Sequence, residues 1–441
     1  MATEIIPQAI YDARTLGKPR MLLLGFQHMF AMFGATVLVP ALTGLSVSAT
    51  LLFAGVGTLI FHLITKCKVP AFLGSSFAFI GGYAAVVAMG AAQGLDQAAS
   101  LPYACIGVFF AGLMYFVLAA LIKAFGVKKV MRFFPPVVTG PIIIAIGLTL
   151  SGSALNNCKT NWWIALVAVL IIIVCNIWGK KIIKIIPVLL AVFGSYLVAA
   201  CFGQVDFSKV GEAAWIGLPF KFEDTAFHVF ADPNWGLVLT AIITIVPISL
   251  ATMIEHIGDI CAISSTTGHN YLEDPGLNRT LLGDGIATAV ASMFGAPANT
   301  TYGENTGVLN LTRVFDPRVI RIAAGLAILF SFCPKFAAVI SAMPAATIGG
   351  VSLVLYGMIA AVGLRNLIEN HVDLGAPRNL IIVALILVLA VGVSYGPGNI
   401  SFTVGKATIA LSGLAIAALT GVIVNAILPG KDYEFKGGDV K

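Results

Sequence analysis

The chain alternates long apolar runs with short polar connections. Fourteen runs are long enough to cross a bilayer, or are shorter and interrupted, and lie near 22–44, 47–65, 70–92, 102–126, 134–153, 162–178, 182–202, 236–264, 280–296, 298–315, 319–340, 344–366, 377–395 and 403–428. A helix needs about 20 apolar residues to cross the hydrocarbon core. The third and tenth runs are too short and too rich in Pro, Gly and Ser for ordinary spans. The pattern predicts an all-α polytopic membrane protein with 14 transmembrane segments and short β-strands in the broken segments 3 and 10.

Composition supports a membrane protein and excludes several other classes. Of the 441 residues, 59% are hydrophobic and 10% are charged, whereas a soluble domain carries about 25% charged residues. The net charge of +6 lies in short connections, so we expect no nucleic-acid partner. The seven Cys are scattered, and no His, Cys and Asp cluster has the spacing of a metal site. We expect the lipid bilayer as surroundings, no metal, no cofactor and no enzymatic activity.

The basic residues predict the orientation. All but five of the 26 Lys and Arg residues fall in connections on the side that holds both termini, the five being Lys159, Lys209, Lys221, Lys335 and Lys406. Cytoplasmic connections are enriched in Lys and Arg. We therefore expect a multi-pass protein of the cell membrane with both termini cytoplasmic, an extracytoplasmic loop at 203–235 and a cytoplasmic tail at 429–441.

The two halves of the chain resemble each other weakly. Three short matches recur in order, pairing residues 26–29 with 254–257, 69–71 with 296–298, and 134–140 with 343–349. Seven spans per half is an odd number, so the second copy must insert upside down. Inverted repeats with broken segments at equivalent places indicate a transporter whose site lies near the bilayer midplane. The prediction is a 7+7 inverted repeat.

The polar stretch from Pro297 to Arg313, between apolar runs, is the first candidate for a binding site. Its beginning is poor helix material, and a short helix can start near Asn305. Glu304 lies where the two meet, and a charge at this depth needs a partner or a function. Free backbone N–H groups at the helix start would suit ligand carbonyls, and the carboxylate would suit ligand N–H groups. A helix cap or an inter-helix tie is the structural alternative.

Two further carboxylates lie on one helix face, because Glu255 and Asp259 are four residues apart. Both ionised at membrane depth would repel, so one is expected to hold a proton and to couple its movement to transport. Asp259 near the cytoplasmic end, in water, is the structural alternative. His28 could orient a buried carboxylate in proton coupling, or be a satisfied core residue. His256 points about 100° away from Glu255, which favours a structural role.

The third run offers a facing strand. Gly74, Ser75, Ser76 and Phe77 could pair their backbone with the tenth run, and Phe77 would offer a backbone N–H and an aromatic face. The alternative for Phe77 is plain core packing.

The sequence from Glu304 to Arg313 (Glu-Asn-Thr-Gly-Val-Leu-Asn-Leu-Thr-Arg) resembles the signature of the nucleobase–ascorbate transporters, or nucleobase–cation symporter family 2. The Gln27-His28 pair is a second mark of that family. Stretches 27–40, 70–79, 299–305 and 349–357 are similar to its uracil permease branch. The resemblance runs from about residue 20 to 428.

The resemblance implies two parts: a core of segments 1–4 and 8–11 (20–126 and 236–340), and a gate of segments 5–7 and 12–14 (127–202 and 341–428). It implies that the carboxylates of Glu255 and Glu304 receive the N–H groups of uracil. It also implies that the backbone N–H groups of Phe77 and Gly303 meet the uracil carbonyls.

By the same resemblance, Ala35, Tyr302 and Tyr356 wall the pocket. A well-known uracil member has His where this chain has Asp259, so the pH dependence of uptake can differ here. Many members of the family form homodimers through the gate, although nothing in the sequence itself indicates one.

The predicted function is secondary active transport of uracil into the cell, coupled to proton entry by alternating access. Uracil has two N–H donors and two carbonyl acceptors, which two carboxylates and two backbone N–H groups complement. The alternatives are a xanthine or urate (purine) permease of the same family, an anion transporter or channel of the same architecture, and a membrane enzyme. An anion carrier would need a cationic residue where this sequence has two acids.

Overall fold

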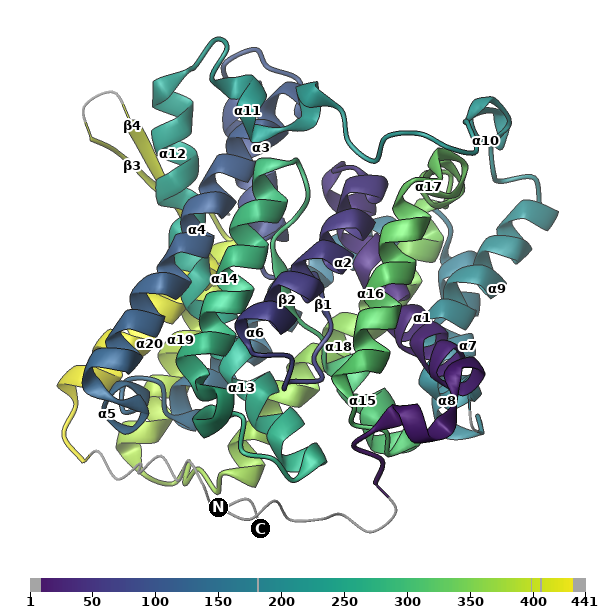
Figure 1. Ribbon diagram of the computed structural model, residues 1–441. Coiled ribbons are helices and arrows are strands. Elements are labelled where there is room, and N and C mark those ends of the chain that lie inside the picture. The colour runs from purple at the N-terminus through teal and green to yellow at the C-terminus, as the bar shows by residue number, and fades with distance from the viewer. Residues whose placement is uncertain (1–8, 181, 398, 405–406, 431–441) are drawn as a thin grey trace.

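The computed structural model describes residues 9–180, 182–397, 399–404 and 407–430. It is mostly helical, with long helices packed side by side (Figure 1). The helices of the first half are η1 Ala13–Leu16, α1 Lys18–Thr43, α2 Val47–Ile64, α3 Ile80–Ala91, α4 Gln97–Phe125, α5 Val127–Met131, α6 Pro136–Cys158, α7 Trp162–Ile177, α8 Ile182–Ile185 and α9 Pro187–Cys201.

The predicted loop 203–235 holds three short helices: α10 Ser208–Glu212, η2 Phe222–Asp224 and α11 Ala226–Val229. The helices that follow are α12 Trp235–Ile245, η3 Val246–Ile248, α13 Ser249–Thr267, η4 Leu272–Gly276, α14 Leu277–Met293, α15 Gly303–Thr312, α16 Pro317–Ser331, α17 Pro334–Ser341, α18 Ala345–Glu369, α19 Pro377–Tyr395 and α20 Gly413–Ile427. Among the described residues, seven helices have the length and hydropathy to cross a membrane. An eighth is added if α16 and α17, bent by 86° at their junction, are one span.

The third and tenth runs each hold a short strand followed by a helix. Strand β1 (Leu73–Ser75) pairs antiparallel with β2 (Asn299–Thr301), and Gly74 lies opposite Thr300. The pairing continues past the strands, because the backbone N–H of Ser76 donates to Ala298 O at 2.8 Å. Both strands are fully buried near the middle of the molecule (Figure 1). Extended backbone inside a bilayer must be covered by protein, and these contacts meet that need.

The last predicted span, 403–428, differs from the observed structure. Strands β3 (Asn399–Val404) and β4 (Ala407–Ser412) form an antiparallel hairpin, and helix α20 begins only at Gly413. The expected apolar span 403–428 is therefore only partly helical, because its first part forms a strand hairpin that the sequence analysis did not predict. The part of the sequence that forms this hairpin is rich in β-branched residues such as Thr408 and Ile409. Hydrophobicity alone does not separate a strand from a helix in such a run.

The helices pack in two groups. In one group α14 packs against α2 and α4, and α16 packs against α1 and α2. In the other, α6 packs against α18 and α19, while α7 packs against α9 and α18. Helix α13 contacts α4 and α14 of the first group and α6 of the second, and it also contacts β2, α15 and α20. The element that carries Glu255 and Asp259 therefore lies between the two groups.

An N-terminal strap, defined here as residues 9–17, lies across the end of α15. The backbone N–H of Ile10 donates to Arg313 O at 2.8 Å, and Phe315 N–H donates to Ile10 O at 2.8 Å. The Asp316 carboxylate accepts the backbone N–H of Ala13 at 2.7 Å. The hydroxyl of Tyr11 donates to Thr267 O at 2.8 Å, at the end of α13. The strap thus joins the ends of α13 and α15.

Candidate functional site

The strand pair fixes the position of Tyr302. Its hydroxyl donates to Ser75 O at 2.9 Å and lies 3.3 Å from the Thr36 hydroxyl of α1. A side chain on Gly74 would collide with the Tyr302 ring, so the ring lies directly over β1. The side chain is only 4% exposed. Tyr302, which the resemblance places in the pocket wall, is thus held firmly between α1 and β1.

Asp259 is tied to the strand pair. Its Oδ2 accepts a 2.7 Å hydrogen bond from the hydroxyl of Thr301 in β2. The structure therefore places this carboxylate beside the broken tenth segment, at the level of the strands. This hydrogen bond disfavours the alternative in which Asp259 lies in water at the end of its helix.

Glu255 and Glu304 lie on α13 and in the first turn of α15, respectively. Each is half buried, and neither side chain forms a hydrogen bond or ion pair with another residue that the structure describes. Helix α13, which carries Glu255 and Asp259, packs against α15 with Glu304 and against α14 with Asp284. The two predicted ligand-binding carboxylates therefore belong to one cluster and keep acceptor positions for a ligand.

Glycines leave open space beside these carboxylates. A Cβ built on Gly303, next to Glu304, would meet no atom within 4 Å. The same holds for Gly258, between Glu255 and Asp259. Gly303 is the first residue of α15, where backbone N–H groups have no partner inside the helix. Donors, acceptors and free space thus occur together at this point.

Two aromatic residues from different helix groups meet near the site. The rings of Phe77, which follows β1, and Tyr356 of α18 pack edge to face with centroids 5.7 Å apart. Both side chains are buried. The neighbouring Ser76 hydroxyl is buried with no partner in the described chain. Ala35 is buried in α1, one residue before Thr36, whose hydroxyl reaches Tyr302.

His28 contacts an amide where a carboxylate was one expectation. Asn305 Nδ2 lies 3.2 Å from His28 Nδ1 and donates to His28 O at 3.0 Å. Both residues are buried. Because Asn305 follows Glu304, this contact joins the start of α15 to α1. The structure therefore gives His28 a positioning contact at the site.

The structure also reveals a buried pair that the sequence analysis missed. His256 Nδ1 lies 2.9 Å from Asp284 Oδ2 of α14, and both side chains are 0% exposed. The rings of Phe61 and Tyr115 pack against His256. The contact with Asp284 agrees with the structural role that the sequence analysis favoured for His256. Asp284 lies in an apolar run, which is the same signal that pointed to Glu255.

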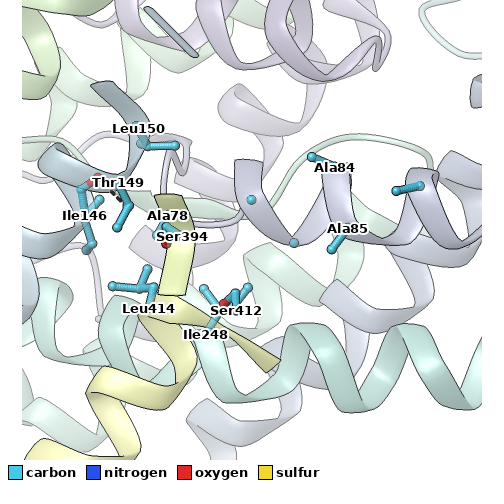
Figure 2. Close-up of a pocket in the computed structure, with 13 residues that line it drawn as sticks. Ala78, Ala84, Ala85, Ile146, Thr149, Leu150, Ile248, Ser394, Ser412 and Leu414 are labelled. Carbon is cyan, nitrogen blue, oxygen red and sulfur yellow. Dashed lines mark hydrogen bonds between the residues drawn. The ribbon is translucent and has the colours of Figure 1, made fainter. Parts of the chain in front are cut away.

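A cavity of about 310 Å³ lies beside the site. Figure 2 shows α3 residues Ala84 and Ala85 on one side and α6 residues Ile146, Thr149 and Leu150 on the other. Ala78, the residue after Phe77, also lines it, as do Ser394 and Ser412. Its described lining combines the hydroxyl residues Thr149, Ser394 and Ser412 with alanine, leucine and isoleucine side chains and has no charge, which suits a neutral solute.

The sequence match decides the family. A model of the Permease family matches residues 19–399. The chain belongs to this family. It is 42% identical over 431 residues to a uracil permease of Bacillus caldolyticus, covering 96% of this chain and 94% of that protein. It is 36% identical over 416 residues to a uracil permease of Escherichia coli, covering 92% and 90%. The predicted resemblance is confirmed, and the chain is a multi-pass membrane transporter and no enzyme.

A solved structure of a different transporter has the same fold. The transmembrane domain of a cyanobacterial bicarbonate transporter, BicA, aligns with a TM-score of 0.61 over 93% of this chain and 99% of that one. The identity is 18%, so the likeness concerns the fold alone. A mostly helical transporter fold is therefore confirmed.

Proposed function

We propose that this permease carries uracil into the cell together with a proton, by alternating access. The relatives that match most of the chain are named uracil permeases. The single observation that carries the proposal is the pair of half-buried carboxylates, Glu255 and Glu304, that lack protein partners among the described residues.

The chemistry of the site complements a flat neutral pyrimidine. In our proposal Glu255 and Glu304 accept the two uracil N–H groups, and the backbone N–H groups of Phe77 and Gly303 donate to its carbonyls. Charge-assisted hydrogen bonds of this kind are stronger than neutral ones. The Phe77 and Tyr356 rings, which touch each other, then bound the site between the two helix groups.

The proton is assigned to the carboxylate cluster. Glu255 and Asp259 share one face of α13, which packs against α14 with Asp284 and against α15 with Glu304. Asp284 is paired with His256, and Asp259 accepts one hydroxyl. Mutual repulsion among Glu255, Asp259 and Glu304 favours one bound proton, which we assign to Glu255 or Asp259. Entry of this proton with the substrate neutralises the site while it changes sides.

For the moving parts we propose the 7+7 arrangement, with a core of 20–126 and 236–340 and a gate of 127–202 and 341–428. The two packing groups of helices support this division, since α14 and α16 pack within the core and α18 packs within the gate. Sliding of core against gate would expose the site to each side in turn, with both termini in the cytoplasm.

Labelled-uracil uptake into proteoliposomes tests the proposal. We expect an inward proton gradient to stimulate uptake, and excess unlabelled xanthine to leave it unchanged. Uptake that xanthine blocks would assign the chain to purines. Uptake that ignores the gradient would leave the binding site in place and remove the coupling role from Glu255 and Asp259.

Glu304→Gln separates the pyrimidine proposal from the purine alternative. The neutral amide loses a charge-assisted hydrogen bond, so we expect uracil uptake to fall about tenfold. Glu369→Gln, on an exposed part of α18, is the matched control and should be unaffected. Full uracil uptake in Glu304→Gln would contradict the assigned role.

A further inference from the structure

A second cavity, of about 450 Å³, lies between α4, α5, α13 and α20. We name it the α4–α20 groove. Aliphatic and aromatic side chains form its walls, including Val117 and Leu121 of α4, Met253 of α13 and Val422 of α20. Val117 and Leu121 are 48% and 41% exposed, so the groove opens outward. Such apolar surface in a membrane protein faces lipid chains.

One end of the groove is cationic. Lys129 of α5 is the single charged residue among its described lining residues. Lys123, Lys128 and Arg132 are close to it in sequence, and all four are exposed. No acidic residue occurs between Asp96 and Asp206 to offset these charges. An apolar trough that ends at a basic cluster matches a molecule with an apolar tail and an anionic head.

We propose that the α4–α20 groove is a binding site for one anionic phospholipid. An acyl chain lies along α4 between Val117 and Phe125, and the phosphate meets Lys129. Basic pockets between transmembrane helices are known to recognise such headgroups. The chemistry differs from that of the acidic substrate site, where an anion would be repelled.

The position of the groove connects the lipid to transport. Met253 in its wall lies two residues before Glu255 on α13. α4 belongs to the proposed core, and Val422 belongs to the proposed gate. A lipid in the groove therefore contacts both moving parts and supports the helix that carries Glu255. This regulatory consequence rests on the proposed function, whereas the binding does not.

Native mass spectrometry of the purified full-length protein, with equimolar phosphatidylglycerol and phosphatidylcholine, measures the binding directly. We expect at least one phosphatidylglycerol to be retained in preference to phosphatidylcholine. Lys129→Gln should lower its occupancy about fivefold, as expected for loss of one interfacial cation. Lys184→Gln removes an exposed lysine of α8 outside the groove and should change nothing.

A second pair of variants tests the apolar part. Val117→Trp fills the groove from an exposed position and should abolish retention of the lipid, whereas Val174→Trp on the exposed face of α7 should not. Equal retention of both lipids by the wild type, or equal losses in Lys129→Gln and Lys184→Gln, would overturn the proposal. Retention in Val117→Trp would do the same. These measurements detect bound lipid and do not depend on transport. Their outcome is therefore independent of whether the protein carries uracil.

Discussion

Gly303 has no side chain, and this leaves free space at the candidate site. It begins α15 beside Glu304, and a Cβ there would meet no protein atom within 4 Å. Space that the protein leaves empty at a cluster of acceptors is available to a ligand. A small side chain introduced at position 303 should therefore interfere with a bound ligand and leave the fold unchanged.

We predict that Gly303→Ala lowers uracil uptake about tenfold or more, because one methyl group in a fitted pocket has an effect of this size. Thermal stability in detergent should stay unchanged. Gly325→Ala is the matched control, since its Cβ also meets no atom within 4 Å but lies on α16. Equal uptake in the two variants would show that Gly303 does not border the substrate.

The His256–Asp284 pair predicts a different outcome at the residue scale. Both side chains are fully buried, so removing one partner leaves the other without compensation. We expect His256→Leu and Asp284→Leu each to destabilise the protein by about 3–5 kcal/mol. The double variant should lose less than the sum of the two, and thermal unfolding in detergent measures all three. Strictly additive losses would contradict a direct interaction.

Residue types alone indicate part of the candidate site. A carboxylate in an apolar run, as at Glu255 and Glu304, is a clear signal because its burial is unfavourable. Asp284 carries the same signal and was overlooked. The contacts of Asp259 with Thr301 and of His28 with Asn305 join residues 42 and 277 positions apart. No local pattern encodes such distances.

At the scale of elements, the apolar runs located most helices, and Pro, Gly and Ser indicated the two broken segments. The runs did not show the β3–β4 hairpin or the 86° bend between α16 and α17. A strand and a helix can be equally apolar, and the bend occurs at Pro334. Hydropathy measures how strongly a segment prefers apolar surroundings, and it carries little information about backbone direction.

The packing of α6 against α18 gives a prediction for elements. A Cβ on Gly363 would lie 2.6 Å from Gly140 O, so the two helices touch at their backbones. We expect Gly363→Ala to destabilise the protein by about 1–3 kcal/mol, seen as a lower melting temperature. Gly357→Ala, on the same helix, has open space and should melt like the wild type. Equal melting of both variants would argue against close packing at this crossing.

At the scale of the whole molecule, the N-terminal strap gives a pH prediction. Hydrogen bonds from Arg14 lower the pKa of Asp12 from 3.8 to about 2. A lowered pKa stabilises the fold above the unfolded value of 3.8, and this contribution disappears as the pH falls through 2. Asp12→Asn should therefore shift the melting temperature equally at pH 5 and pH 8, and by progressively less as the pH falls from 3.8 to below 2.

A difference between pH 5 and pH 8 would show that Asp12 titrates in that range and would contradict this assignment. If none is found, any change of uptake over that range must come from other groups. The carboxylate cluster on α13, α14 and α15 is then the first place to look.

The pairing of β1 with β2 has a consequence for how the transporter is made. Each strand comes from a different half of the chain, and three residue pairs join them. Glu255 and Glu304 follow the 203–235 connection, whereas Phe77 and Ser76 precede it. If the gene were divided within that connection, neither polypeptide would contain a complete site. Co-expressed fragments would restore uptake only by assembling, because the proposed binding site lies at the contact between the two halves of the chain.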